Sequence, residues 1–242
     1  MQEESDKVLL EATRLCQDER EIEAEALVKK QMALEPGNLK LMTMLGVIQA
    51  RLCKDNKAES TFRTVLSRDP NYEDAICGLG RLLDQSLRID EAEELYIMFL
   101  QNNPGHFALE DLCRLLISEN RVDEALKLAR NHATQYETNP YAFNAIRYAL
   151  HVLEDQLENE LNDDRENELL FTKLIENIFE QLELVEALER IAKLPKDKQI
   201  ELDDDKTRLI GELDYLIQSA PSRNISVSSE IQDKIEHLKR AL

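Results

Sequence analysis

The fold is decided by a pair of segments that share one spacing of residues. Residues 39–70 read LKLMTMLGVIQARLCKDNKAESTFRTVLSRDP, and residues 73–104 read EDAICGLGRLLDQSLRIDEAEELYIMFLQNNP. In each segment a Leu-Gly pair is followed by an alanine twelve residues after the glycine, and by a proline twelve residues later. The same steps join Ala12, Ala24 and Pro36. A period of 34 residues predicts a protein built from stacked repeats.

The landmarks of these units resemble those of the tetratricopeptide repeat. Leu79-Gly80, then Ala92-x-x-x-Tyr96, then Pro104 follow the L-G…A-x-x-x-F…P pattern of that family. The resemblance implies that each unit is a pair of antiparallel helices, and that the chain is an all-α, right-handed superhelical solenoid. We expect the glycines to lie where the two helices approach, and the prolines to stop the second helix.

The repeat pattern fades along the chain. Cys113 takes the place of the glycine in the fourth unit, and Pro140 follows Ala125 after fifteen residues instead of twelve. Asn162 stands where the next alanine is due. We therefore expect an array of four repeats plus the first helix of a fifth in residues 1–158, and a helical extension that ends in a capping helix in residues 159–242.

Three features of the extension carry local predictions. Between Glu154 and Glu168 eight carboxylates accompany one arginine, which indicates a solvated helix end or an acidic connection. Residues 203–205 are three aspartates, typical of a helix N-terminus. Residues 219–224 read as a linker before a short helix, and the apolar stripe of that helix either caps the last core or pairs with another copy.

The composition limits the function. The chain of 242 residues is 43% apolar and 33% charged, with six Gly and six Pro, as expected of a helical protein. Its 30 Lys and Arg stand against 49 Asp and Glu, and a net charge of -19 opposes nucleic-acid binding. The acidic first residues do not resemble a secretory signal, and no run is long enough to span a membrane. We expect a cytoplasmic chain or a fragment of a longer one.

Residues that could support catalysis are scattered. The four cysteines and four histidines show no metal-ligand spacing, and no nucleophile elbow or phosphate-binding glycine loop occurs. The sequence predicts a protein that is not an enzyme, with no cofactor and no metal.

Arginines recur at nearly the repeat length. Arg81, Arg114 and Arg147 are 33 residues apart, and the geometry of the resembled family places them with Arg51 and Tyr148 on the concave groove. Aligned guanidinium groups favour an acidic or phosphorylated peptide. The alternative is that each arginine pairs with a carboxylate of the next helix, such as Asp84, Glu110 or Asp111, and ties neighbouring units together.

The function that the resemblance implies is protein–protein interaction, with a peptide or partner protein in the groove. An alternative is a regulatory or substrate-presenting arm of a longer enzyme such as a transferase. Self-association as a scaffold is a third possibility.

Overall fold

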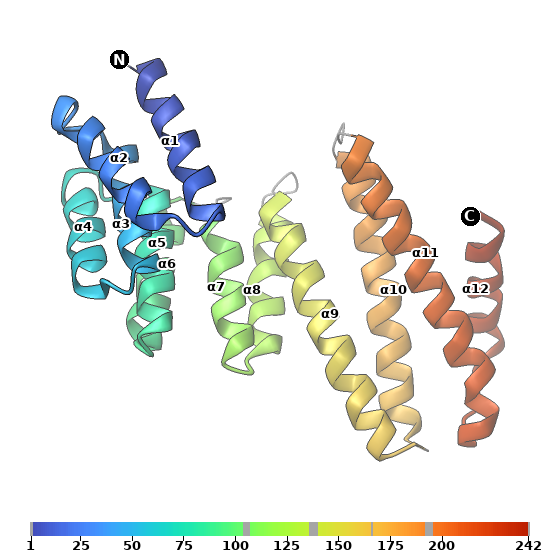
Figure 1. The fold of residues 1–242 in the computed structure, drawn as a ribbon. Helices are drawn as coiled ribbons and strands as arrows, with labels where there is room; N and C mark the ends of the chain where they lie inside the picture. Colours follow the sequence, from blue (N-terminus) through green and yellow to red (C-terminus); the bar gives the residue numbers. More distant parts are fainter. Residues whose placement is uncertain (1, 104–106, 136–139, 166, 192–195, 242) are drawn as a thin grey trace. The chain divides into compact units, whose positions relative to one another are not determined.

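The computed structural model shows an all-α chain. It describes residues 2–103, 107–135, 140–165, 167–191 and 196–241, which form twelve α-helices and one short 3-10 helix. The chain divides into two compact units, Met1–Leu115 and Leu116–Leu242. Within each unit the helices follow one another as antiparallel neighbours (Figure 1). The prediction of an all-α fold is therefore confirmed.

The first unit contains three complete helix pairs. Its helices are α1 (Gln2–Gln17), α2 (Glu21–Leu34), α3 (Leu39–Arg51), α4 (Asp55–Arg68), α5 (Glu73–Gln85), α6 (Ile89–Asn102) and the greater part of α7 (Ala108–Ser118). Each of α1 to α5 packs against the helix that follows it, and α3 also packs against α1 and α5. The first helix of each pair therefore contacts its counterpart in the neighbouring pair.

The second unit is built from longer helices. Its elements are α8 (Val122–Gln135), α9 (Pro140–Asp163), α10 (Glu168–Ile191), α11 (Lys196–Ser219), the 3-10 helix η1 (Ala220–Arg223) and α12 (Ser229–Ala241). Helices α9, α10 and α11 have 24 residues each, against 13 or 14 in α2 to α6. Asn162 lies in the last turn of α9, so the alanine step of the shorter units has no counterpart there. Whether the repeat array ends at residue 158 stays a prediction.

Aromatic rings fill the notches that glycines leave in the first unit. A Cβ atom on Gly46 would lie 2.7 Å from the ring of Phe62, and one on Gly80 would lie 2.3 Å from the ring of Tyr96. Both rings are buried. The expectation that these glycines mark close helix approaches is confirmed. A third glycine, Gly78, escaped the sequence pattern, although its Cβ would lie 2.5 Å from the same Phe62 ring.

The turn inside each helix pair uses a left-handed residue that is not glycine. Glu19, Cys53, Leu87 and Asn120 have φ between 55° and 59°. The amide of the next residue donates to a carbonyl five residues back, as in Arg88 N to Leu83 O at 2.9 Å. This bond closes a Schellman-type helix end, in which the left-handed position is usually glycine. The chain accepts backbone strain at each of these turns.

Two local predictions for the extension are wrong. The three aspartates at 203–205 lie in the interior of α11, because this helix begins at Lys196, about two turns before them. Residues 219–224 are not a free linker, since Ala220 and Arg223 of η1 are buried. The last helix, α12, buries Ile235 against the core of its own unit, and its role as a cap stays a prediction.

Replacing Gly80 by Leu should lower the free energy of unfolding by about 1–3 kcal/mol, because the added atoms must displace the buried ring of Tyr96. Gly211→Ala is the matched control, since a Cβ there meets nothing within 4 Å and alanine favours helix. Thermal or urea melts measure both. An unchanged midpoint for Gly80→Leu would contradict the close approach of α5 and α6.

Replacing Leu87 by Gly should raise the free energy of unfolding by about 1 kcal/mol, because glycine adopts a φ of 58° without strain. The Leu87 side chain is 85% exposed, so little packing is lost. Gln85→Gly, two residues earlier in the last turn of α5, serves as the control and should destabilise the chain by a similar amount. Equal losses for the two variants would argue against strain at the turn.

Candidate partner-binding surface

Arg81 and Asp111 form an ion pair between the first helices of two neighbouring helix pairs. The Nε and Nη2 atoms of Arg81 on α5 donate to Oδ1 of Asp111 on α7 at 3.1 and 3.0 Å, and Nη2 lies 2.8 Å from Oδ2. The Asp111 side chain is 6% exposed, whereas that of Arg81 is 58% exposed. The carboxylate is thus buried while the guanidinium keeps access to solvent.

Two buried groups lie beside this ion pair. The hydroxyl of Tyr96 donates to the carbonyl of Cys77 at 3.5 Å. Burial, together with the negative charge of Asp111, raises the pKa of the Cys77 thiol and of the Tyr96 phenol well above their usual ranges. Both groups stay protonated at neutral pH, so neither serves as a nucleophile or a base here.

Arg51 and Arg114 are the other two predicted groove residues of the first unit. Arg51, at the end of α3, donates from Nε to Glu21 Oε1 at 3.0 Å and from Nη2 to the carbonyl of Cys16 at 2.6 Å. Arg114 is exposed on α7, three residues after Asp111 and therefore on the same helix face. Asp111, which binds Arg81, and Arg114 therefore share one face of α7.

Arg147 and Tyr148 belong to the second unit. Arg147 of α9 donates from Nη1 to Asp205 Oδ2 of α11 at 3.0 Å, and Tyr148 is exposed. These contacts of Arg51, Arg81 and Arg147 are with a carboxylate or carbonyl of another helix, and Arg81 contacts Asp111, an acid that the alternative interpretation named. A continuous ladder of all four arginines stays a prediction.

A second set of ion pairs, which the sequence analysis missed, links the second helices of the pairs. Lys54 and Arg88 occupy the N-cap positions of α4 and α6. Lys54 Nζ lies 2.7 Å from Glu25 Oε2 on α2, and Arg88 Nη1 lies 2.8 Å from Glu59 Oε2 on α4. We call these two contacts the N-cap ladder. Their signal in the sequence is the 34-residue recurrence of both the cation and the acid.

The contacts of the N-cap ladder lower the pKa values of its two acids. Hydrogen bonds from Lys29 and Lys54 lower the pKa of Glu25, and the hydrogen bond from Arg88 leads the causes that lower the pKa of Glu59. The contribution of these acids to stability is present above their ordinary pKa values and is lost as the pH falls through the lowered ones. The ladder is therefore intact at neutral pH.

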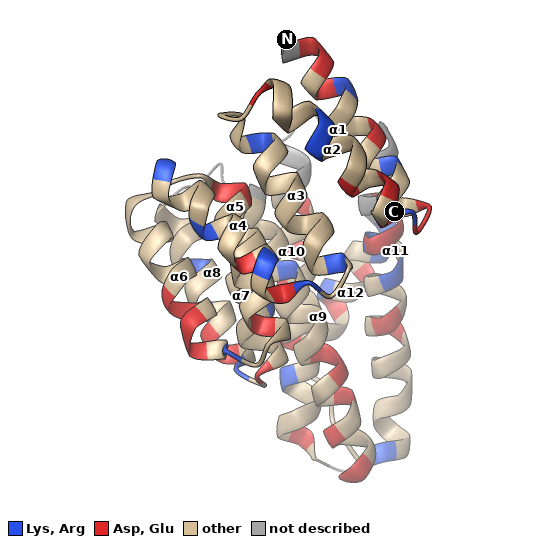
Figure 2. Cartoon of the chain, turned by 60° about the vertical axis from the view of Figure 1, so that its left-hand side comes forward, with Lys and Arg blue, Asp and Glu red and all other residues tan. Residues whose placement is uncertain are grey.

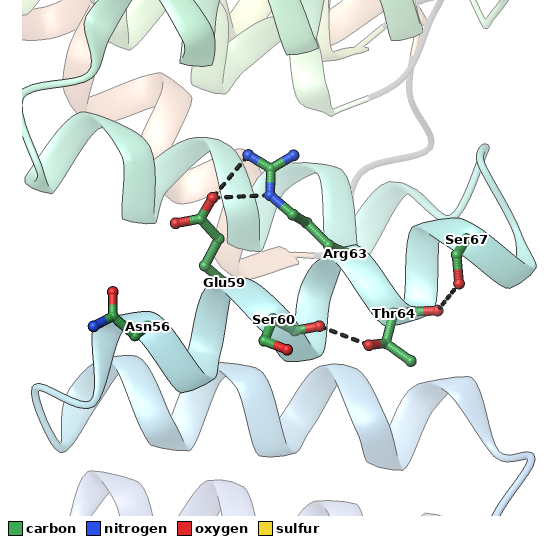
Figure 3. A pocket seen from close by; sticks show the side chains of 6 residues that line it. All are labelled: Asn56, Glu59, Ser60, Arg63, Thr64 and Ser67. Atoms are coloured by element: carbon green, nitrogen blue, oxygen red, sulfur yellow. Dashed lines mark hydrogen bonds and ion pairs between the residues drawn. The ribbon is translucent and has the colours of Figure 1, made fainter.

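A hollow of about 490 Å³ runs along the outer face of α4 (Figure 3). Its lining consists of Asn56, Glu59, Ser60, Arg63, Thr64 and Ser67. The short side chains create the hollow, and their hydroxyls donate within the helix, from Thr64 to the Ser60 carbonyl and from Ser67 to the Thr64 carbonyl. Arg63 is likewise held by Glu59 at 2.8 Å. Arg63, Thr64 and Ser67 therefore each make a hydrogen bond within their own helix.

Charges of both signs are spread over the helices, with acids in excess (Figure 2). Among the described residues no group of His, Cys, Asp and Glu has the arrangement of a metal site. None of the helices in the described part of the chain has the length and apolar character needed to span a bilayer.

Comparisons with known proteins identify the fold. A thermophilic tetratricopeptide repeat protein of Thermus thermophilus, TTC0263, superposes with a TM-score of 0.51 at 14% identity, over 83% of this chain and 97% of that one. A tetratricopeptide repeat protein of Parabacteroides merdae covers 96% of this chain and 97% of its own at 16% identity and a TM-score of 0.46. The chain therefore has the fold of tetratricopeptide repeat proteins, as its sequence pattern predicted.

The sequence comparisons add no family beyond this fold. No family model and no curated protein sequence matches the chain. A structure of Naa15/Naa10 bound to HypK-THB is similar over 89% of this chain and 37% of that one, with 18% identity and a TM-score of 0.48.

Replacing Asp111 by Ala should lower the free energy of unfolding by about 1–2 kcal/mol, between the values for exposed and buried ion pairs, because the Arg81 end is solvated. Glu23→Ala is the control, since the Arg20–Glu23 pair is exposed at both ends and should contribute clearly less to stability. Chemical denaturation measures both values. Equal effects would show that the buried carboxylate does not tie α5 to α7.

Proposed function

We propose that the chain is a protein-interaction module. Its first helices present the groove residues Arg51, Arg81 and Arg114 in the first compact unit, and a peptide segment of a partner protein binds on this face. Arg147 and Tyr148 of α9 are the candidate groove residues of the second compact unit. Support comes from the tetratricopeptide repeat fold, in which stacked helix pairs expose an extended surface.

The observation that carries the proposal is the orientation of Arg81. Asp111 engages its Nε and Nη2 and thereby holds the guanidinium plane in place, while more than half of the side chain stays exposed. A guanidinium has five N–H donors, so the outer edge of Arg81 can still donate to a ligand. Because the group is already oriented, little rotamer freedom is lost on binding.

The partner that suits this surface is an acidic or phosphorylated peptide. Arg114 lies one turn beyond Asp111, so a second guanidinium group lies on the helix face that carries the carboxylate bound by Arg81. Carboxylate and phosphate oxygens form charge-assisted hydrogen bonds with such groups. The net charge of -19 over the whole chain disfavours binding of nucleic acid at the same place.

The test uses an array of acidic and phosphorylated peptides on the intact chain. Arg114→Ala should weaken the tightest peptide about tenfold or more, because one charge-assisted bond contributes roughly 1.5–3 kcal/mol. Titration calorimetry gives the affinity, which should also fall with added salt. Arg63→Ala, at an exposed arginine on α4, is the control and should leave the affinity unchanged.

The opposite pattern would contradict this proposal. If Arg114→Ala lowers the melting temperature as much as Asp111→Ala and leaves peptide affinity intact, the arginines serve to hold neighbouring helix pairs together. The partner would then have to bind elsewhere on the chain.

A further inference from the structure

A buried polar network crosses the long helices of the second unit. Glu154, at the middle of α9, has a side chain that is only 4% exposed. Its Oε2 accepts from Nε2 of Gln181 on α10 at 2.6 Å. That nitrogen also donates to Asn177 Oδ1 at 2.8 Å, and Asn177 Nδ2 donates to the carbonyl of Leu150 at 3.1 Å. Glu154 is therefore fixed in place and lies far from the solvated helix end that the sequence indicated.

A second carboxyl group approaches Glu154 from α11. The side chain of Glu212 interacts with the Glu154 carboxyl, and its Oε2 is buried without a hydrogen-bond partner among the described residues. Arg208 Nη1 lies 2.6 Å from Glu212 Oε1 and 3.7 Å from Glu154 Oε1. One guanidinium thus serves two carboxyl groups, of which Glu154 is buried while Glu212 and Arg208 keep partial access to solvent.

The remaining charged groups near Glu154 come from three elements. His151 Nδ1 on α9 lies 3.7 Å from Glu154 Oε2, and Glu158 follows one turn later on the same helix. Asp205 of α11 acts on Arg208, and Arg223 of η1 acts on Glu158. From α10 the neighbours that bond to Glu154 and extend the network are the uncharged Gln181 and Asn177.

Two carboxyl groups can share a hydrogen bond only if one of them keeps a proton. Burial, reinforced by the hydrogen bond and charge of Glu212, raises the pKa of Glu154 to about 7. The pKa of Glu158 is also raised, chiefly because the side chain is partly buried. Glu154 thus keeps its proton at pH values at which most exposed glutamates are fully ionised.

We propose that Glu154 and Glu212 form a protonation-dependent latch that fastens α9 to α11. With one proton shared, a neutral carboxyl group donates a hydrogen bond to the other, ionised carboxylate, and this pair lies between the two helices. When that proton leaves, two carboxylates face each other with Arg208 between them, and the helix packing loosens. The second unit would therefore tighten in mildly acidic surroundings and open in alkaline ones.

The sign of the effect follows from proton linkage. Glu154 binds its proton more tightly in the folded chain than in the unfolded one, so its contribution is complete below the ordinary pKa and is lost as the pH rises to about 7. The equilibrium constant for opening should rise on the order of tenfold to thirtyfold between pH 5.5 and pH 8. The acids of the N-cap ladder, with lowered pKa values, cannot produce this direction of change.

Hydrogen exchange of the intact chain at pH 5.5 and pH 8, corrected for intrinsic exchange rates, reads the latch directly. In the wild type, amides of α9 and α11 should lose protection at pH 8. Glu154→Gln keeps the shape of a protonated carboxyl and should abolish this difference, and Glu212→Gln should do the same. Glu160→Gln on the exposed face of α9 and His151→Gln are the controls and should keep it.

Two results would overturn the latch. One is a pH difference that survives in Glu154→Gln, and the other is a difference that vanishes in His151→Gln. Should Glu154→Gln fail to fold, carboxyl NMR of the wild type decides the matter. A Glu154 titration midpoint near 7 supports the latch, and a midpoint near the ordinary value for glutamate refutes it.

Discussion

The spacing of the first unit depends on the ring of Phe62, which fills two notches at once. Gly46 belongs to the same helix pair as Phe62, and Gly78 belongs to the next pair. A single side chain therefore sets both the separation of two helices within a pair and the separation of neighbouring pairs. Burying such a ring contributes roughly 1.5–3 kcal/mol, and the close backbone contact adds dispersion that a larger residue would remove.

Ion pairs add what apolar packing lacks, which is a preferred register. Hydrophobic surfaces attract without direction, so two helices could slide by a turn at modest cost. The buried Asp111 under Arg81 and the acids of the N-cap ladder each have one correct partner. Because the acids of the N-cap ladder are more exposed than Asp111, their pairs contribute less to stability than the Arg81–Asp111 pair, and their main effect is to penalise the wrong alignment.

The sequence predicted the positions at which close packing requires a small residue. It did not predict contacts between residues that are far apart in the chain. Gly46 and Gly80 recur in step because each faces a ring of its own pair. Gly78 has Met44 and Leu112 at the equivalent places, so no period reveals it. Arg147 meets an acid 58 residues away, and the burial of Glu154 requires α10 and α11 to pack beside α9. No local pattern encodes such pairings.

The N-cap ladder also bears on how a chain of this kind changes length. Lys54 and Arg88 face acids at the same offset in the preceding pair, and each follows a left-handed turn residue. Excision of residues 54–87 would join Cys53 to Arg88, with Arg88 opposite Glu25 and Tyr96 opposite Gly46. These two contacts would match the present ones, but Val47 would take the place of Arg81 opposite the buried Asp111. Loss of a helix pair at this point therefore preserves these contacts of the second helices and requires a new partner for Asp111 on the first helices.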